Sequence, residues 1–537
     1  FPTLMSVLRF FFVILRGNFI GMTITELQQQ YAAHPNMVVM KRLLKDTSVQ
    51  TVFCGGLCAS AASLFSSVLV QEGGCPFVFI LGDLEEAGYF YHDLTQILGT
   101  ERVLFFPSSF RRSIKYGQKD AANEILRTEV LSRLQKGEEG LCIVTYPDAL
   151  AEKVVSRKEL SNKTLKLNVG EKVDTTFITD VLHSYGFEYV DYVYEPGQYA
   201  VRGSIIDVFS FASEYPYRID FFGDEVESVR TFEVESQLSR EKKDGVSIVP
   251  DLAVTGDVTT SFLDFIPKET TLAMRDFLWL RERIQVVHDE ALTPQAIAVQ
   301  EAEENGGITL EGKLIDGSEF AVRALDFRRL EFGNKPTGTP NASVTFNTSA
   351  QPIFHKNFDL VASSFKDYLE KGYSLYICSD SMKQTDRIKA IFEDRGDKIN
   401  FTPVERTIHE GFVDNTLRLC IFTDHQLFDR FHKYNLKSDK ARSGKVALSL
   451  KELNQFTPGD YVVHTDHGIG RFSGLVRIPN GDTTQEVLKL VFQNEDVVFV
   501  SIHSLHKVSK YKGKEGEAPR LNKLGTGAWE KLKERTK

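Results

Sequence analysis

The sequence predicts a multidomain α/β protein. Blocks of alternating strand and helix patterns are joined to blocks in which strand patterns dominate. The length of 537 residues corresponds to about three or four domains at roughly 150 residues per domain. With 42% hydrophobic and 26% charged residues, the composition is that of folded globular protein and excludes a disordered chain.

Charge and cysteine content exclude further classes. The net charge of −9 argues against binding nucleic acid over the whole surface, because such binding needs clusters of cations. Six cysteines are too few for a disulfide framework, so we expect a cytoplasmic protein with reduced thiols. The apolar run near the start has only six residues between Arg9 and Arg16, whereas a membrane span needs about 20. We therefore expect residues 1–21 to be upstream sequence before a start at Met22.

Residues 22–146 alternate between strand and helix patterns, which predicts a parallel sheet with crossover helices. The first strand-turn-helix, VFCGGLCASAASLF, stands where a P-loop NTPase carries its phosphate loop. Gly55 and Gly56 are present, but no lysine follows in residues 59–63 and GK[ST] occurs nowhere in the chain. We predict a degenerate P-loop-type fold with an inactive loop; the alternative is an unconventional phosphate site at this helix N-terminus.

Residues 147–240 are dominated by strand patterns, which predicts an α+β domain inserted into the parallel-sheet domain. The stretches YAVRGSIIDVF and YPYRIDFF read as two antiparallel strands joined by SFASE. Alternation puts Ile219 and Phe221 of the second strand on the face opposite to Arg218, Asp220 and Phe222. Reading YAVRGSIIDVF as one strand places Arg202 and Ile205 on opposite faces.

An aromatic ring beside two arginines has the composition of an interface hot spot. Phe222 with Arg202 and Arg218 fits that description. The alternative is that Phe222 is ordinary core and the arginines form solvated pairs with Asp220 and Glu225.

The rest of the chain contains three further blocks. Residues 241–345 are mixed, with a long helical pattern over 277–304 and a predicted linker, PTGTPNASVTFN. Residues 346–430 read as a small α/β domain, followed by a basic linker at 431–446. Residues 447–513 read as a small all-β unit. The charged helical pattern after it stops without a cap, so we expect a longer parent protein.

Histidines and cysteines do not form a recognisable metal site. Cys54 and Cys58 have no second close pair of ligands, and His464 and His467 lie beside glycines typical of a tight turn. No nucleophile elbow, HExxH motif or paired-carboxylate signature is found. We therefore predict no metal and no catalytic residues in this chain.

Several segments resemble the bacterial transcription-repair coupling factors (Mfd). The stretch GFEYVDYVYEPGQYAVRGSIIDVF through YRIDFFGDEVESVRTF resembles their UvrB-homology module, and LGDLEEAGYFYHDLTQIL with FPSSFRRSIKYGQ resembles its degenerate first part. EGFVDNTLRLCIFTDHQLF is similar to the domain that follows. GDYVVHTDHGIGRFSGL with EVLKLVFQNEDVVFVSIHSLHKVSKY resembles the CarD-like, Tudor-type domain that binds RNA polymerase. LNKLGTGAWEKLK resembles the hinge that leads into the translocase.

The resemblance implies a domain order for the N-terminal half of such a factor, without its motor. The expected parts are an upstream segment (1–21), UvrB-homology domain 1a (22–146), UvrA-binding domain 2 (147–240), domain 1b (241–345), a small α/β domain (346–430), a basic linker (431–446), a CarD-like Tudor-like β-barrel (447–513) and a hinge (514–537).

The resemblance also implies partners and residues. Matching positions assign UvrA binding to Arg202, Arg218 and Phe222; Ala200 stands where the excision-nuclease B subunit has a further arginine. Binding to the RNA polymerase β subunit falls near the end of the strand RFSGLVRI. These polymerase-binding residues are Leu475, Val476, Arg477 and Ile478.

Alternation along RFSGLVRI places Phe472 and Val476 on one face, with Ser473, Leu475 and Arg477 on the other. Ile478 shares the parity of Phe472 but lies at the strand end before Pro479, where we expect it to leave the barrel interior.

The resulting expectation is an adaptor that recruits UvrA to stalled RNA polymerase in transcription-coupled nucleotide excision repair. ATP and Mg²⁺ would belong to the absent motor domains, which would also supply most DNA binding, and no membrane is involved. The alternatives are a UvrB-like excision helicase component, which the missing lysine disfavours, and a free-standing CarD-like transcription regulator.

Overall fold

A computed structural model describes residues 21–72, 74–109, 121–234, 236–252, 259–293, 296, 310–432, 434, 457–464, 466–480, 483–501, 508–511, 519–524 and 529. The chain divides into two compact units, Phe1–Glu159 with Asp257–Asn435 and Leu160–Gly256 with Leu436–Lys537. Residues 1–20, most of the predicted basic linker and most of 514–537 lie outside the described residues. In the described part of the chain, no helix is long and apolar enough to cross a membrane.

The first unit contains a seven-stranded parallel sheet in the order β18-β2-β17-β16-β3-β5-β4. Its strands are β2 (Thr51–Gly55), β3 (Phe77–Ile80), β4 (Val103–Phe106), β5 (Cys142–Thr145), β16 (Thr271–Met274), β17 (Arg328–Gly333) and β18 (Ala342–Thr345). The central strands β3, β5 and β16 are mostly apolar and buried along their whole length, as expected for a parallel sheet with helices on both faces. The predicted parallel sheet is confirmed.

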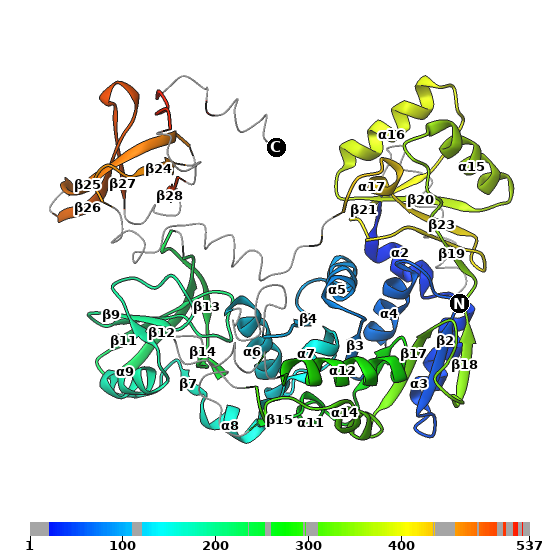
Figure 1. Ribbon diagram of the computed structural model, residues 1–537, viewed down its shortest axis with the longest axis horizontal. Helices are drawn as coiled ribbons and strands as arrows, with labels where there is room; N and C mark the ends of the chain where they lie inside the picture. Colours follow the sequence, from blue (N-terminus) through cyan, green and yellow to red (C-terminus); the bar gives the residue numbers. More distant parts are fainter. Residues whose placement is uncertain are drawn as a thin grey trace. The chain divides into compact units, whose positions relative to one another are not determined.

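Helices α4 (Ala61–Glu72) and α5 (Leu84–Leu98) pack together on one face of this sheet, and α12 (Phe277–Ala291) and α14 (Gly317–Ala324) pack together on the other (Figure 1). The neighbouring strands β3 and β16 therefore send their following helices, α5 and α12, to opposite faces. This divergence opens a crevice at the carboxyl ends of the two strands. Other elements of the unit are α2 (Ile24–Tyr31), α3 (Pro35–Lys45), α6 (Ala121–Gln135), α7 (Pro147–Ala151), β6 (Val154–Val155), β15 (Thr259–Thr260) and α11 (Phe262–Phe265).

The predicted linker PTGTPNASVTFN is partly a strand, so that prediction was wrong. Its second half forms β18, which pairs in parallel with β2, with Ala342 opposite Val52. The prolines and glycine that suggested a linker precede the strand. The alternating segment Ala342–Thr345 then completes the sheet edge beside β2.

A second, six-stranded sheet lies in the same unit, in the order β1-β21-β20-β23-β22-β19. Its strands are β1 (Met22–Thr23), β19 (Thr348–Ala350), β20 (Ser374–Ser379), β21 (Thr402–Glu405), β22 (Phe412–Asp414) and β23 (Leu419–Thr423), with α17 (Asp424–Leu427) after the last. Helices α15 (Phe358–Glu370) and α16 (Met382–Asp394) cover an aromatic core that includes Phe365, Phe392 and Phe422. The start of the described chain joins this sheet, because β1 pairs in parallel with β21.

The second unit contains a six-stranded sheet in the order β13-β12-β11-β10-β9-β8 (Figure 1). Its strands are β8 (Glu188–Tyr189), β9 (Gln198–Arg202), β10 (Ile205–Val208), β11 (Tyr217–Phe222), β12 (Glu225–Phe232) and β13 (Ser239–Lys243); β7 (Leu165–Asn168) pairs with β14 (Gly245–Ile248) beside it. Helix α9 (Thr175–Ser184) packs Ile178 and Leu182 into a core with the apolar side of the sheet. The predicted antiparallel hairpin is confirmed as β10 and β11.

The stretch predicted as one strand, YAVRGSIIDVF, forms the two antiparallel strands β9 and β10. Gly203 has a φ of 62° and makes the turn between them, a backbone conformation that glycine adopts without strain. Arg202 and Ile205 are directly opposite each other across this hairpin and lie on the same face. The prediction that they face opposite sides was wrong.

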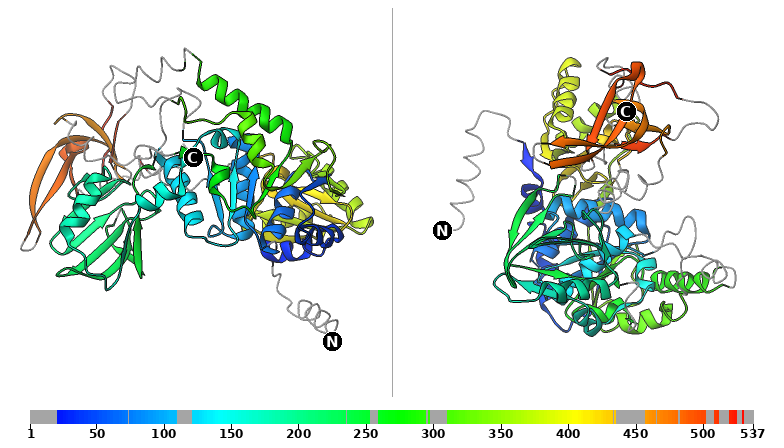
Figure 2. Two further views of the ribbon diagram at one scale, coloured as in Figure 1. Left: turned by 90° about the horizontal axis from the view of Figure 1, so that it is seen from below. Right: turned by 90° about the vertical axis from the view of Figure 1, so that its left-hand side faces the viewer.

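A separate sheet of the second unit has the order β27-β26-β25-β24-β28, and every pairing in it is antiparallel. Its elements are β24 (Tyr461–His464), β25 (Gly468–Asn480), β26 (Thr483–Val491), the 3-10 turn η1 (Gln493–Glu495), β27 (Val497–Ser501) and β28 (Val508–Lys510). Strands β25 and β26 form a long hairpin, orange in Figure 2. Among the described residues the five strands form an open sheet.

A β-bulge interrupts β25 after Phe472. Phe472 lies opposite Leu490 and Leu475 lies opposite Leu488, so three steps along β25 match two along β26. Gly474, with a φ of 110°, accommodates the extra residue. Leu475 is therefore on the same face as Phe472, and Val476, opposite Val487, is on the other. The simple alternation predicted for RFSGLVRI was wrong, as was the predicted shared parity of Ile478 and Phe472, because Ile478 lies opposite Gln485 in the shifted register.

Candidate partner-docking face

One side of the six-stranded sheet in the second unit carries charged side chains, whereas the other is the apolar core. We call this side the arginine face and define it by Arg202, Asp207, Arg218, Asp220, Phe222 and Arg230. The register sets its rows: Ala200, Asp207, Arg218 and Arg230 are opposite one another across β9 to β12. Arg202, Ile205, Asp220 and Ser228 form the next row. The sheet thus brings together charges from four strands.

Asp207 is the centre of the arginine face and is fully buried. Its Oδ1 accepts a hydrogen bond from Arg218 Nε at 2.8 Å, and its Oδ2 accepts one from Arg218 Nη2 at 2.9 Å. Arg202 Nη2 also donates to Oδ2. One carboxylate therefore holds two of the three predicted UvrA-binding residues.

Each of these arginines also lies over an aromatic ring. The Arg218 guanidinium carbon is 4.6 Å from the Phe232 ring centroid, and its Nη1 donates to the Gln237 carbonyl at 3.1 Å. The Arg202 guanidinium carbon is 4.8 Å from the Tyr192 ring centroid. The Arg218 side chain is only 15% exposed, compared with 32% for Arg202. Arg218 is thus part of the domain's own packing as well as of its surface.

Phe222 is 80% exposed at the end of β11, beside the turn at Gly223. The alternative that it is core is therefore wrong. The other half of that alternative also differs from the structure, because Arg218 pairs with Asp207. Asp220 instead pairs with Arg230 and accepts from Ser228 Oγ at 3.1 Å.

Sequence reasoning missed Asp207 and Arg230. Asp207 stands in the apolar run SIIDVF, and a single carboxylate in such a strand was the available signal. Recognising its role required the turn at Gly203, which brings β9 alongside β10. Arg230 lies opposite Arg218 on β12 and could be found only from the register of that hairpin.

The loop after β2, which the sequence predicts to be a degenerate phosphate loop, is hydrogen-bonded to other parts of the chain. Cys58 N donates to Thr348 Oγ1 at 3.0 Å, and that hydroxyl donates to the Gly56 carbonyl at 2.7 Å. Ser60 N donates to the Glu410 carbonyl at 3.3 Å. A Cβ at Gly56 would lie 2.0 Å from the Phe346 carbonyl oxygen. Two N–H groups at a helix start, where a phosphate would bind, are thus bonded to the protein itself.

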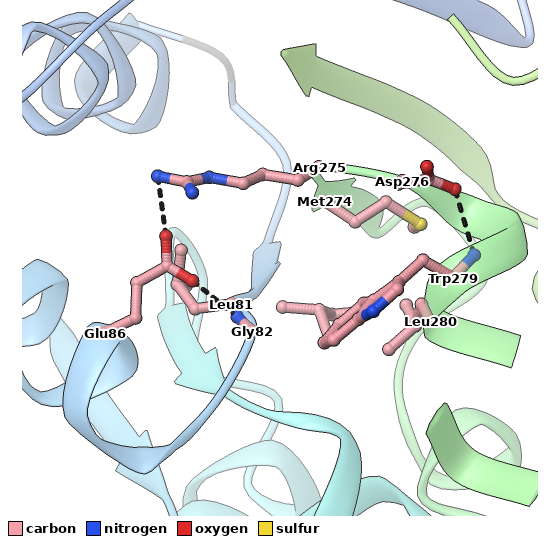
Figure 3. A pocket seen from close by; sticks show the side chains of 9 residues that line it. Leu81, Gly82, Glu86, Met274, Arg275, Asp276, Trp279 and Leu280 are labelled. Carbon is pink, nitrogen blue, oxygen red and sulfur yellow. Dashed lines mark hydrogen bonds and ion pairs between the residues drawn. The ribbon is translucent and has the colours of Figure 1, made fainter. Parts of the chain in front are cut away.

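A cavity of about 290 Å³ lies in the crevice between the ends of β3 and β16 (Figure 3). Its apolar lining includes Met274 and Trp279. At its rim Arg275 pairs with Glu86 at 2.6 Å, and Glu86 accepts from Gly82 N at 2.7 Å (Figure 3). Since its charged groups pair within the lining, the cavity indicates no ligand class.

Four histidines gather where α5 meets the six-stranded sheet of the first unit. The His432 ring centroid is 4.5 Å from that of His425 and 5.0 Å from that of His92, and Tyr89 stacks on His409 at 3.5 Å. Burial lowers the pKa of His92, His409 and His425 to about 4 each. These rings are therefore neutral at physiological pH. In the described chain, no group of three potential ligands is placed to hold a metal ion.

The predicted polymerase-binding strand end lies on β25. Leu475 is 43% exposed and Val476 is half-buried; the side chains of Arg477 and Ile478 lie outside the described residues. In the described part of the sheet, β24 pairs only with residues 468–471 of β25, whereas residues 475–480 pair with β26 alone. Among the described residues, one side of this half-strand therefore has no pairing strand, which is the arrangement that strand addition requires.

Comparisons with known proteins identify both regions. Residues 165–253 match the family model described as UvrB interaction domain, and residues 456–512 match the CarD-like/TRCF RID domain. The transcription-repair-coupling factor of Staphylococcus aureus (strain bovine RF122 / ET3-1) is 23% identical over 552 residues, covering 89% of this chain and 46% of the relative. That of Bacillus subtilis (strain 168) is 23% identical over 557 residues, covering 89% and 47%. The resemblance to these factors is confirmed, and the chain spans about half the length of these curated relatives.

Proposed function

We propose that this chain is the adaptor portion of a transcription-repair coupling factor, which links stalled RNA polymerase to recruitment of UvrA in transcription-coupled nucleotide excision repair. The observation that carries the proposal is the presence of two interaction modules in one chain, a UvrB interaction domain and a CarD-like/TRCF RID domain. A free-standing CarD-like regulator would not need the first module.

UvrA would bind the arginine face. Phe222 offers an exposed ring, and Arg202 offers a partly exposed guanidinium; aromatic residues and arginine are both enriched at protein interfaces. The polymerase β subunit would bind the half-strand of β25 that pairs only with β26, by strand addition near Leu475, Val476, Arg477 and Ile478. We further propose that this open sheet belongs to a Tudor-like barrel.

The chain would do this without ATP chemistry of its own. The seven-stranded sheet would be a degenerate P-loop-type fold, since its loop lacks the phosphate-binding lysine and its N–H groups bond to Thr348 and Glu410. ATP, Mg²⁺ and most DNA binding would belong to the half of the relatives that this chain does not span. A UvrB-like helicase role would instead require nucleotide binding here.

A pull-down with UvrA and with the polymerase β subunit separately tests the proposal. The 537-residue chain should capture each partner. Phe222→Ala should lose UvrA and retain the β subunit, and Ile478→Arg should do the opposite, so each variant is the control for the other. Capture of neither partner by the unaltered, folded chain would overturn the adaptor function.

A further inference from the structure

We propose that Asp207 is the positioning residue of the arginine face, a buried carboxylate that orients Arg202 and Arg218 together toward a carboxylate of the partner. The proposal deepens the proposed function and rests on it for the identity of the partner. Asp207 is fully buried and cannot touch a partner itself. Any effect it has on binding must therefore pass through the groups that it holds or through the stability of the domain.

The geometry fixes Arg218 in one orientation. Its Nε and Nη2 bond the two oxygens of Asp207, and its Nη1 bonds the Gln237 carbonyl. Such a bidentate pair sets the plane of the guanidinium as well as its position. Of the five N–H groups of an arginine, these bonds occupy three. One N–H on each terminal nitrogen is left to bond a partner.

Arg202 is attached more loosely to the same carboxylate. It reaches Asp207 Oδ2 through Nη2 and lies over the Tyr192 ring. Arg202 comes from β9 and Arg218 from β11, whereas Asp207 comes from β10 between them. The carboxylate therefore sets the spacing of two guanidinium groups that no direct contact would hold side by side, because like charges repel.

The charge balance identifies the chemistry of the partner. Asp207 neutralises only one of its two arginines, while the neighbouring pair of Arg230 and Asp220 is balanced. One net positive charge is left at Arg202 and Arg218, beside the strand that ends in the exposed Phe222. The matching surface on UvrA should then present a carboxylate for the arginines and an apolar recess for the ring.

The test uses the full chain with Asp207→Asn, which keeps the size of the side chain and removes its charge. We expect the Kd for UvrA, measured by titration calorimetry, to rise at least 10-fold. Asp207→Glu keeps the charge and should recover part of that loss. Asp424→Asn is the matched control away from the arginine face: its carboxylate is nearly buried and pairs with Arg430, and the variant should change the Kd less than 3-fold. Wild-type affinity for Asp207→Asn, or an equal loss for Asp424→Asn, would overturn the proposal.

A double-mutant cycle separates positioning from general support of the fold. If Asp207 acts through the arginines, Asp207→Asn should change the Kd less than 3-fold when Arg202→Ala and Arg218→Ala are already present. An undiminished loss in that background would show a merely structural role. If Asp207→Asn does not fold by circular dichroism, Asp207→Glu takes its place in the cycle.

A second readout does not depend on UvrA. In protein labelled with ¹⁵N-arginine, the Nε–H of Arg218 should exchange slowly with water, and Asp207→Asn should abolish that protection. Retained protection in the variant would contradict the positioning role. Failure of the unaltered chain to bind UvrA would instead refute the proposed function, because the protection measurement would be unaffected.

Discussion

Of the changes on the arginine face, replacing Phe222 by alanine should weaken UvrA binding with the least effect on the free energy of unfolding. The ring is 80% exposed, so about 160 Å² of a side chain of roughly 200 Å² is free for a partner. At about 25 cal/mol per Å², complete burial is worth about 4 kcal/mol and half burial about 2 kcal/mol. We therefore expect the Kd for UvrA to rise about 30- to 700-fold, with the free energy of unfolding changed by less than about 0.5 kcal/mol.

Titration calorimetry gives the Kd and urea unfolding gives the stability in the same buffer. The matched control is Tyr189→Ala, which removes another exposed ring, 60% accessible, from the edge strand β8 of the same sheet. Its Kd should stay near the wild-type value. An unchanged Kd for Phe222→Ala would refute the assignment of the hot spot. A loss of several kcal/mol in stability would refute the exposed placement of the ring.

Three further outcomes are expected. Ile478→Arg should leave the five-stranded sheet of β24 to β28 folded by circular dichroism and abolish capture of the polymerase β subunit, because binding would desolvate the new charge against an apolar patch of the partner. An unfolded sheet would show that Ile478 is core, and unimpaired capture would place the contact elsewhere. An ATP titration of the chain should give no heat of binding, because the loop that starts at Gly55 has no lysine and bonds to Thr348, whereas a stoichiometric micromolar site would contradict this. The stability of the first unit should depend on His92, whose pKa is about 4 when folded and about 6.5 when unfolded. Since the unfolded state then binds more protons, the stability contributed by a neutral His92 is complete above pH 6.5 and is lost as the pH falls toward 4, by about 2 kcal/mol at pH 5. Between pH 7 and pH 5, urea unfolding should therefore show that His92→Gln loses about 2 kcal/mol less stability than the unaltered chain. An equal loss of stability in the two proteins would mean that the His92 ring is not buried and neutral.

The parallel sheet of the first unit was predictable because its strands are short, continuous apolar runs with helical patterns between them. The strand at Ala342–Thr345 was not predictable, because the prolines and glycine before it indicate a linker. The segment becomes a strand only by pairing with β2. Predictions of which face a strand residue occupies, made from simple alternation, failed where a glycine turn or bulge shifted the register. Gly203 turns β9 back on β10, and Gly474 accommodates a bulge in β25.

Residue type alone left the role of this face open, because two arginines and an aromatic ring fit an interface hot spot as well as ordinary core with solvated ion pairs. The resemblance to a known family assigned Arg202, Arg218 and Phe222 to UvrA binding, and that assignment stays a prediction. Asp207 could not be assigned in the same way, because its partners are brought to it by the register of β9 and β11. A buried carboxylate becomes informative only when the strands on either side of it are known.

The two sheets of the first unit cannot be separated by one cut in the chain. Strand β1 at the start of the described chain completes the edge of the six-stranded sheet beside β21, and only Phe346 and Asn347 separate β18 in one sheet from β19 in the other. A recombinant piece that begins at residue 346 would keep β19 but leave β21 with an unpaired edge, open to pairing with another molecule. Adding residues 22–31 back as a separate peptide should cover that edge and keep the piece monomeric. Biochemists who divide this protein into parts for binding assays should therefore keep residues 22–31 with the six-stranded sheet, although α2 also packs on α4 and α5 of the seven-stranded sheet.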